Sequence, residues 1–542
     1  MAAVNLGKRG RAMSDNIIVT PNYQWSNEHN NLHKQVLRRY QIDNGTDPIW
    51  KDGLDGIMEM IKQVKAGKER LRSYGGKWSL SDVAICNDSI HDSKPLKFFA
   101  SIGEGSIVGK PLFPDDPKPY NKRLFFFQSG AQIMQINNAL EKRGFCLPTT
   151  GASNGQTIAG AVSTGTHGAA FTVGAMQDYV RALHIVTDED EHYFIQPKSN
   201  PVINKNFSNI FGAKLKNDDD LFYSALVSFG SFGVIHGLII ETVSLYMLEA
   251  YCKRVDYNDA ETLFPALAAF DHSKTDNLKD FQAQFGLPKN ADPYHIRVII
   301  NPYESKDNAF LEVMYKRKYS KPKLSPLPDG SGRRVGDDIL SVIGGIALAT
   351  GDLVPSVVSM FFGEVAEEYD KYIQTPRNIF GDSTIQKPKD GGASTELGVP
   401  IDRAQAAIRL VMQKAVQANF LGVIGVRFVK PSKATLAFTR FAPITCTIEL
   451  PGLNSGSTQA FYRSVFGAMD AAAIPFTLHW GQEGDYSRER LDKMYGASVN
   501  AWQKQRTRLL PESLQRYMFT NDFTKRCGLN EPAPLQGGDV IA

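Results

Sequence analysis

The chain has 542 residues, of which 42% are hydrophobic and 22% charged, proportions typical of a globular protein with more than one core. Sixty-one Lys and Arg residues against 57 Asp and Glu leave a formal charge of only +4. Nucleic-acid binding requires clustered basic residues, so this balance argues against nucleic acid as the main partner. Five cysteines without CxxC spacing fit neither a disulfide framework nor a zinc site and indicate a reducing, cytoplasmic compartment.

The first half of the chain predicts helices and strands in alternation. An amphipathic helix is expected over 55–66, where apolar residues recur at helical spacing. A second helix over 132–143 follows the apolar run 124–127 and ends at Gly144, a natural C-terminal cap. Strands are then expected over 180–186, 193–195 and 234–245.

The composition changes after about residue 246. Candidate helices alternate with strand-like pieces such as 296–300, and loops are expected over 316–334 and 386–392, which together predict a separate α+β domain. The most apolar stretch, 339–363, is interrupted by Asp352 and Pro355 into pieces shorter than the roughly 20 residues of a membrane helix. No transmembrane helix is expected. A pair of buried helices is favoured; the alternative is a membrane-facing patch, or helices that line an apolar entrance for a greasy substrate.

Small residues dominate the stretch 151–168, which reads GASNGQTIAGAVSTGTHG. Such a loop lets the backbone approach a ligand closely and directs N–H groups toward anionic oxygens. The hydroxyls of Ser163, Thr164 and Thr166 add donors suited to a pyrophosphate. A flexible linker is the alternative, but apolar segments flank the loop on both sides. Two further Gly/Ser-rich loops, 72–82 and 228–237, complete a set able to wrap an extended dinucleotide.

Two other nucleotide-binding patterns are not supported. The segment 103–110, GEGSIVGK, lacks the first Gly at the phosphate-loop spacing, and Pro111 stands where a magnesium-binding Ser or Thr is needed. This segment is expected to form a turn. No GxGxxG follows an N-terminal strand, so a Rossmann domain is not expected.

With these loops in place, the chain resembles the vanillyl-alcohol-oxidase-type (PCMH-type) FAD flavoproteins, and within them the sugar-lactone and alditol oxidase branch. The likeness is firm over about 50–245, where GASNGQTIAGAVSTGTHG and LVSFGSFGVIHG stand in family order. It is looser over about 420–530, which contains LHWGQ and FTNDFTKRCGL. Matches in the same order are far more specific than any single glycine motif.

The resemblance implies an α+β fold with a two-lobed FAD-binding domain and a cap domain over the flavin. The expected division is 15–245 for the FAD-binding domain, 246–480 for the cap, and 481–542 for a segment returning to the FAD domain. The cofactor contacts that the resemblance implies are Gly75, Gly76, Trp78, Ser79, Gly151, Thr157, Gly160, Ser163, Thr164, Thr166, His167, Gly230, Gly233 and Ile235.

Two positions depart from the family pattern of flavin attachment. Many relatives tether the flavin to a histidine in the first loop, where this chain has Trp78. The expectation is therefore FAD bound without a covalent link. Cys146 lies near the linking cysteine of doubly tethered relatives, but its spacing is off by one, so a buried free thiol is expected.

A third departure concerns the substrate. Sugar oxidases of this branch carry a Glu-x-Arg pair beneath the flavin; here Arg427 matches and Gly425 replaces the Glu. A guanidinium stays protonated and can still stabilise an anionic ring. Either another group takes the proton of the substrate hydroxyl, or the substrate is not a sugar. His479 is the first candidate for base or orienting residue, and Glu449 is the second.

These residues predict an FAD-dependent oxidoreductase that moves a hydride from the CH–OH group of a sugar-lactone- or polyol-like substrate to flavin. Oxygen or another acceptor would reoxidise it. The alternatives are an oxidase of an apolar alcohol such as a sterol or aromatic alcohol, a flavoprotein with redox-neutral or cyclising chemistry, and a binding protein with structural FAD. Gly425 and the stretch 339–363 favour the apolar alcohol.

Overall fold

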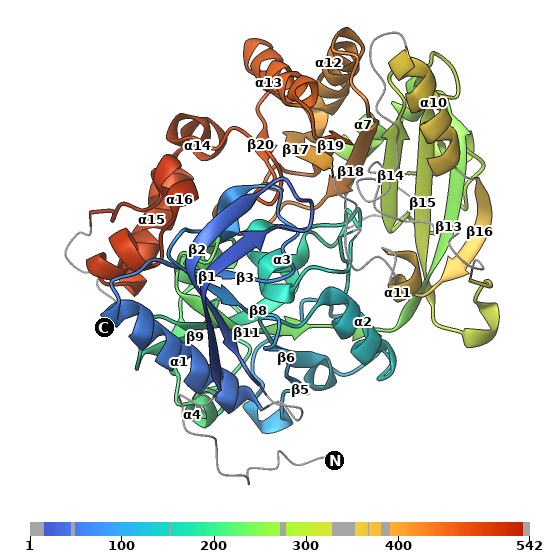
Figure 1. Ribbon diagram of the computed structural model, residues 1–542. Coiled ribbons are helices and arrows are strands. Elements are labelled where there is room, and N and C mark those ends of the chain that lie inside the picture. The colour runs from blue at the N-terminus through green and yellow to red at the C-terminus, as the bar shows by residue number, and fades with distance from the viewer. Residues whose placement is uncertain are drawn as a thin grey trace.

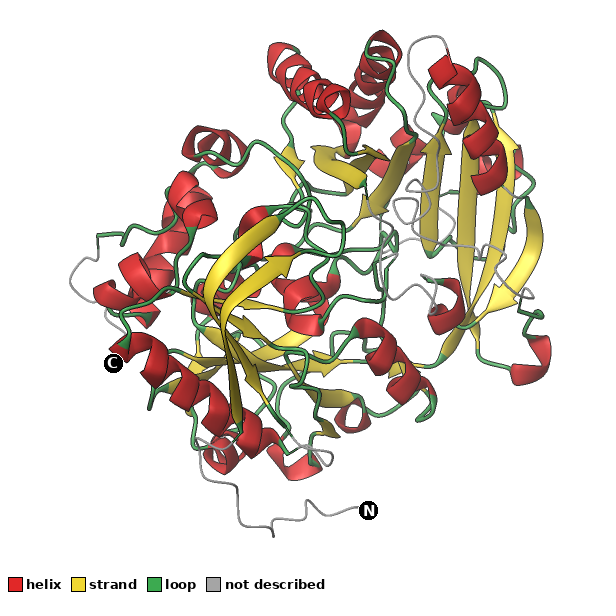
Figure 2. Cartoon of the chain, in the orientation of Figure 1, coloured by secondary structure: helices red, strands yellow, loops and turns green. Residues whose placement is uncertain are grey.

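A computed structural model describes residues 16–44, 49–151, 153–271, 278–327, 353–366, 368–380 and 391–534. The described chain contains three large sheets that lie in separate layers, with helices on their outer faces (Figures 1 and 2). Two of the sheets come from the chain before residue 246, and the third comes from residue 246 onward.

The first sheet has four strands in the order β1-β2-β4-β3. Helix α1 (Trp50–Ala66) packs its apolar face, including Ile57 and Ile61, into the main core. The helix begins five residues before the expected start, at Trp50, whose ring packs on Phe211 with 4.2 Å between ring centroids. The strands are β1 (Ile17–Ser26), β2 (His33–Ile42), β3 (Leu71–Tyr74) and β4 (Ser89–Asp92).

The second sheet has six strands in the order β10-β9-β8-β11-β6-β5. Its strands are β5 (Phe99–Ser101), β6 (Leu124–Gln128), β8 (Val180–Val186), β9 (His192–Gln196), β10 (Lys214–Asn217) and β11 (Val234–Glu241). The helices beside it are α2 (Ile133–Glu141), α3 (Ile158–Thr164), α4 (Lys205–Phe211) and α5 (Asp219–Leu226). The strand expected over 234–245 divides, because β12 (Val243–Ser244) leaves the sheet to pair with β7 (Phe145–Cys146).

The third sheet has eight strands in the order β16-β13-β15-β14-β18-β19-β17-β20, all antiparallel. Its strands are β13 (Tyr246–Val255), β14 (His295–Ile300), β15 (Ala309–Lys318), β16 (Tyr369–Gln374), β17 (Gly392–Pro400), β18 (Ile424–Val429), β19 (Thr445–Leu453) and β20 (Thr477–Leu478). Its helices are α6 (Tyr257–Ala260), α7 (Leu263–Ala268), α8 (Lys279–Gln284), α10 (Val354–Val365), α11 (Pro376–Ile379), α12 (Ala404–Gln417) and α13 (Gly456–Ala471).

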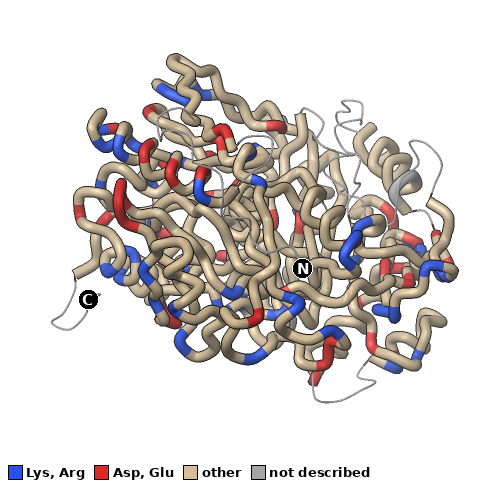
Figure 3. The backbone as a smooth tube through the Cα atoms, turned by 90° about the horizontal axis from the view of Figure 1, so that it is seen from below, with Lys and Arg blue, Asp and Glu red and all other residues tan. Residues whose placement is uncertain are grey.

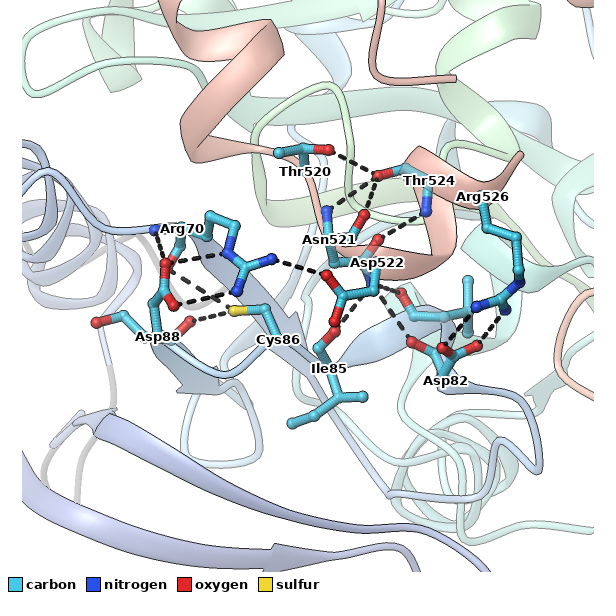
Figure 4. A network of polar contacts seen from close by, with 12 residues as sticks. Arg70, Asp82, Ile85, Cys86, Asp88, Thr520, Asn521, Asp522, Thr524 and Arg526 are labelled. Carbon is cyan, nitrogen blue, oxygen red and sulfur yellow. Dashed lines mark hydrogen bonds and ion pairs between the residues drawn. The ribbon is translucent and has the colours of Figure 1, made fainter. Parts of the chain in front are cut away.

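The last described helices, α14 (Arg488–Tyr495), α15 (Ala497–Leu509) and α16 (Asp522–Arg526), return to the first half of the chain (Figure 1). A polar network fixes α16 there (Figure 4). The Asn521 amide donates to the carbonyl oxygens of Val83 at 3.1 Å and Ile85 at 2.9 Å, and Arg526 pairs with Asp82 at 2.8 Å. These contacts hold the segment that follows β3.

Most predicted elements of the described chain are confirmed within a few residues. Segment 103–110 forms a turn with a short 3-10 helix, Glu104–Ser106, as expected. Strand β15 extends to Lys318, into the expected loop 316–334, of which residues 328–334 lie outside the described residues. The second expected loop, 386–392, lies outside them up to residue 390.

The apolar stretch 339–363 is described only from residue 353, and it contains most of α10. This helix buries Val358 and Phe362 in a core shared with β13 and β15. Met360 and Leu353, the residue before the helix, are exposed. None of the described helices is both long and apolar enough to cross a membrane. Basic and acidic positions are interspersed along the backbone tube in Figure 3, in keeping with the small net charge.

Candidate functional site

One large pocket lies where the three sheets meet. It encloses about 1510 Å³ of space between atoms, a figure that includes solvent at its open mouth. Every residue expected to bind cofactor or take part in catalysis lines it, from the first loop to the strands of the third sheet. Buried polar atoms without a partner among the described residues, Ser129 Oγ, Gln156 Oε1 and Gln482 Oε1, are also on lining residues. These atoms leave hydrogen-bonding capacity in the lining for a ligand with polar groups.

The first and second glycine loops touch one another directly. A Cβ atom on Gly75 would lie 1.9 Å from Thr157 Oγ1, and one on Gly155 would lie 2.4 Å from the indole nitrogen of Trp78. Only residues without a side chain allow these approaches. Trp78 therefore packs against the second loop.

The third loop and a buried arginine complete this part of the pocket, which we call the cradle: the three glycine-rich loops 72–82, 151–168 and 228–237. Gly233 has φ +124°, a backbone conformation that favours glycine, and a Cβ there would lie 2.5 Å from the Val186 carbonyl oxygen. The Arg72 guanidinium donates to the carbonyl oxygens of Val83, at 2.8 Å, and Phe229, and so joins the first loop to the third. Burial lowers the pKa of Arg72 to about 10, so it still carries its charge at neutral pH.

The other end of the pocket holds a cluster of charged side chains from adjacent strands. Arg427 on β18 lies 2.6 Å from Glu449 on β19 and 3.4 Å from Glu396 on β17, measured from Nη1 to the nearest carboxylate oxygens. The Gln482 amide donates to Glu449 at 3.2 Å and to Glu396 at 3.5 Å. All three charged residues are buried.

The strand register shows what stands beside Gly425. Gly425 pairs directly with Glu449 on the next strand, and Glu449 pairs with Glu396 on the strand after it. Position 425 itself has no side chain, but two carboxylates follow it across the sheet. Glu449 was expected as a candidate; Glu396 was not, because nothing in the sequence indicates that β17 lies beside β19.

His479 adopts a defined protonation state. Its Nδ1 accepts a hydrogen bond from the Gly481 N–H at 3.1 Å, so the neutral ring carries its proton on Nε2. Burial lowers the pKa of His479 to about 4, which keeps the ring neutral at physiological pH. This arrangement favours the orienting role over the role of base.

The cysteines lie apart from the pocket lining. All five are described, free and buried, and Cys146 is the buried thiol expected from its spacing. Burial raises the pKa of Cys146 to about 12, so its reactive thiolate form is suppressed.

Comparison with known proteins identifies the class. A family model described as an FAD binding domain matches residues 120–194, which include the second loop. The structure superposes on the cholesterol oxidase of B. sterolicum with a TM-score of 0.65 at 12% identity, over 96% of this chain and 99% of the other. A xylooligosaccharide oxidase of Myceliophthora thermophila gives a TM-score of 0.57 at 10% identity, over 94% of each chain. The chain is an FAD-binding flavoprotein with the fold of the PCMH-type oxidases, as expected.

Two relatives found by sequence comparison have names that specify a substrate. The L-gulono-1,4-lactone dehydrogenase of Mycobacterium tuberculosis is 24% identical over 483 residues, covering 87% of this chain and 93% of the relative. A putative D-arabinono-1,4-lactone oxidase of Neurospora crassa is 31% identical over 208 residues, covering 38% of this chain and 31% of the relative.

Proposed function

We propose that the protein is an FAD-dependent oxidoreductase that oxidises the CH–OH group of a sugar-lactone- or polyol-like substrate. The observation that carries this is the joining of three glycine-rich loops and an Arg-Glu-Glu cluster in one pocket. The loops suit a dinucleotide, and the cluster suits a hydroxylated substrate. The lactone-oxidising relatives support the same conclusion.

The cofactor would lie along the loops, held by their N–H groups and by the hydroxyls of Ser163, Thr164 and Thr166. When bound, FAD supplies the chemistry of accepting a hydride. No histidine stands in the first loop between Gly75 and Ser81, which supports FAD held without a covalent link.

The cluster supplies the proton chemistry. We assign Glu449 as the group that takes the hydroxyl proton, because its carboxylate lies beside Arg427 and opposite the open position Gly425. Arg427 stabilises negative charge that develops nearby. His479, with its proton on Nε2, donates to a substrate oxygen and orients it.

We also propose the division 15–245, 246–480 and 481–542, which places the first two sheets, the third sheet and the returning helices in separate parts. A reducing compartment is supported by five buried free cysteines. Oxygen or another acceptor would reoxidise the flavin.

An anaerobic substrate panel tests the proposed function. We expect the flavin absorbance of the purified protein to bleach with a sugar lactone or an alditol, and Glu449→Gln to slow this bleaching strongly. An apolar alcohol such as a sterol should have no effect, because a buried cluster of charges faces the substrate. Bleaching by the sterol alone would contradict the proposed substrate class, and bleaching by neither would contradict the proposed reaction.

A further inference from the structure

Lys77, in the first glycine-rich loop, has a backbone conformation that favours glycine. Its φ is +59°, in the left-handed region, where a residue with a side chain is strained. Gly75 and Gly76 come directly before it, yet position 77 carries one of the longest side chains. Strain of this kind persists only where the surrounding structure holds the residue in place, and it is often found in binding sites.

The turn between β1 and β2, residues 27–31, holds the loop in this conformation. Three carbonyl oxygens of the loop accept hydrogen bonds from the turn: that of Lys77 from the Glu28 N–H at 2.9 Å, that of Ser79 from the Asn27 amide at 3.0 Å, and that of Leu80 from the Asn31 amide at 3.1 Å. The carbonyl groups of the loop are thus committed to the turn.

The N–H groups of the same loop have a different role. Those of residues 75–79 donate to no acceptor in the described part of the chain, and all five residues line the pocket. Successive N–H groups that are free in this way suit an anionic ligand. Lys77 lies in the middle of this run.

Lys77 also carries a charge that the pocket does not neutralise. Among the described residues of the lining, only Lys77 and Arg427 are Lys or Arg, and Arg427 is paired with two carboxylates. The Lys77 ammonium forms no ion pair with a described acid, and its nitrogen lies 6.0 Å from the ring centroid of Tyr74 in the same lining. Burial lowers the pKa of Lys77, and the nearby charge of Glu28 does not compensate for it. An anionic ligand would supply the partner that this half-buried cation lacks.

We propose that the Lys77 ammonium binds the pyrophosphate of the cofactor, beside the free N–H groups of its own loop. The inference rests on the proposed function, because the anion is part of FAD. A lysine ammonium is a compact charge with three donors and is well suited to phosphate oxygens. The N–H groups contribute partial charges only, so Lys77 supplies the one full positive charge on this loop that faces the anion.

Titration of the apoprotein with FAD, ADP and riboflavin tests the proposal, because ADP contains a pyrophosphate and riboflavin does not. Lys77→Met removes the charge and keeps a side chain at the strained position. The dissociation constants of FAD and ADP should rise about tenfold in this variant, and their dependence on salt concentration should weaken. Riboflavin should bind as before. Lys77→Arg keeps the charge and should retain most of the affinity for FAD.

Lys77→Gly separates the charge from the strain. It should weaken FAD binding as Lys77→Met does, while the denaturation midpoint of the apoprotein moves to a higher denaturant concentration. Lys68→Gly is the matched control, because Lys68 has φ +51° but is exposed after α1 and does not line the pocket. It should raise the midpoint in the same way and leave the dissociation constant of FAD unchanged.

Unchanged binding of FAD and ADP by Lys77→Met overturns the proposal. Equal weakening of FAD and riboflavin binding also overturns it, because the ammonium would then act on the flavin ring. If the unaltered chain binds ADP but not FAD, the proposed function fails, and the ADP titrations still decide the role of Lys77. If the unaltered chain binds neither, both fail.

Discussion

The contact between Gly75 and Thr157 makes a sharp prediction about cofactor binding. A Cβ added at Gly75 would lie 1.9 Å from Oγ1, 2.7 Å from Cγ2 and 2.8 Å from Cβ of Thr157. Rotation of the threonine side chain moves the first two atoms but not its Cβ. Because carbon atoms pack at about 3.5–4.0 Å, Gly75→Ala forces the first loop and the start of α3 apart by on the order of 1 Å.

Overpacking of this kind costs about 1–3 kcal/mol. If that strain is relieved by opening the cradle, the dissociation constant of FAD rises by about 10- to 100-fold, since 1.4 kcal/mol corresponds to a factor of ten. Fluorescence titration of the apoprotein with FAD measures this. Gly103→Ala is the control, because nothing lies within 4 Å of its added Cβ, and it should bind FAD normally.

A double variant separates the steric cause from other effects. Thr157→Gly removes all three clashing atoms, and glycine is tolerated at this helix start at a cost of a few tenths of a kcal/mol. Gly75→Ala with Thr157→Gly should therefore bind FAD more tightly than Gly75→Ala alone. Normal binding by Gly75→Ala, or a double variant no better than the single one, would refute the reasoning.

Three further predictions concern stability, each measured as the free energy of unfolding in denaturant. Arg427→Met leaves two buried carboxylates without their shared guanidinium and should cost about 3–5 kcal/mol, whereas Arg317→Met, at a more exposed pair, should cost about 0–1 kcal/mol. Asn521→Ala removes the donor to the carbonyls that follow β3 and should cost about 1–3 kcal/mol; equal loss from the exposed Asn500→Ala would contradict this. Burial lowers the pKa of His236 to about 3, so the unfolded chain binds a proton at this histidine before the folded chain does as the pH falls. The contribution of His236 to the free energy of unfolding should be constant above about pH 7. Below about pH 6.5 it should decline by up to ~1.4 kcal/mol per pH unit. His236→Gln should reduce that slope, and an unchanged slope would count against the assignment.

The sequence was informative where local pattern decides the outcome. The glycine loops, the helix over 132–143 and the strands around 180 and 296 depend on spacing between neighbours in the chain, and the structure has them where expected. The residues predicted to share a site all line one pocket.

The part that could not be predicted depends on strand order. In the third sheet the strands lie in the order β18-β19-β17, although β17 comes first in the sequence. Glu396 on β17 therefore lies beside Glu449 on β19. This non-sequential order places Glu396, whose carboxylate contacts His167, beside Glu449. The short β12 was missed for the same reason, because its partner β7 is about a hundred residues away.

The central claim is that three glycine-rich loops hold FAD without a covalent link. The most direct test is the visible spectrum of the purified protein, before and after addition of FAD, followed by acid precipitation. We predict flavin absorbance in the protein and yellow colour in the supernatant after acid. A protein that shows no flavin absorbance and gains none with FAD would contradict the binding site, and colour kept in the pellet would contradict the non-covalent link.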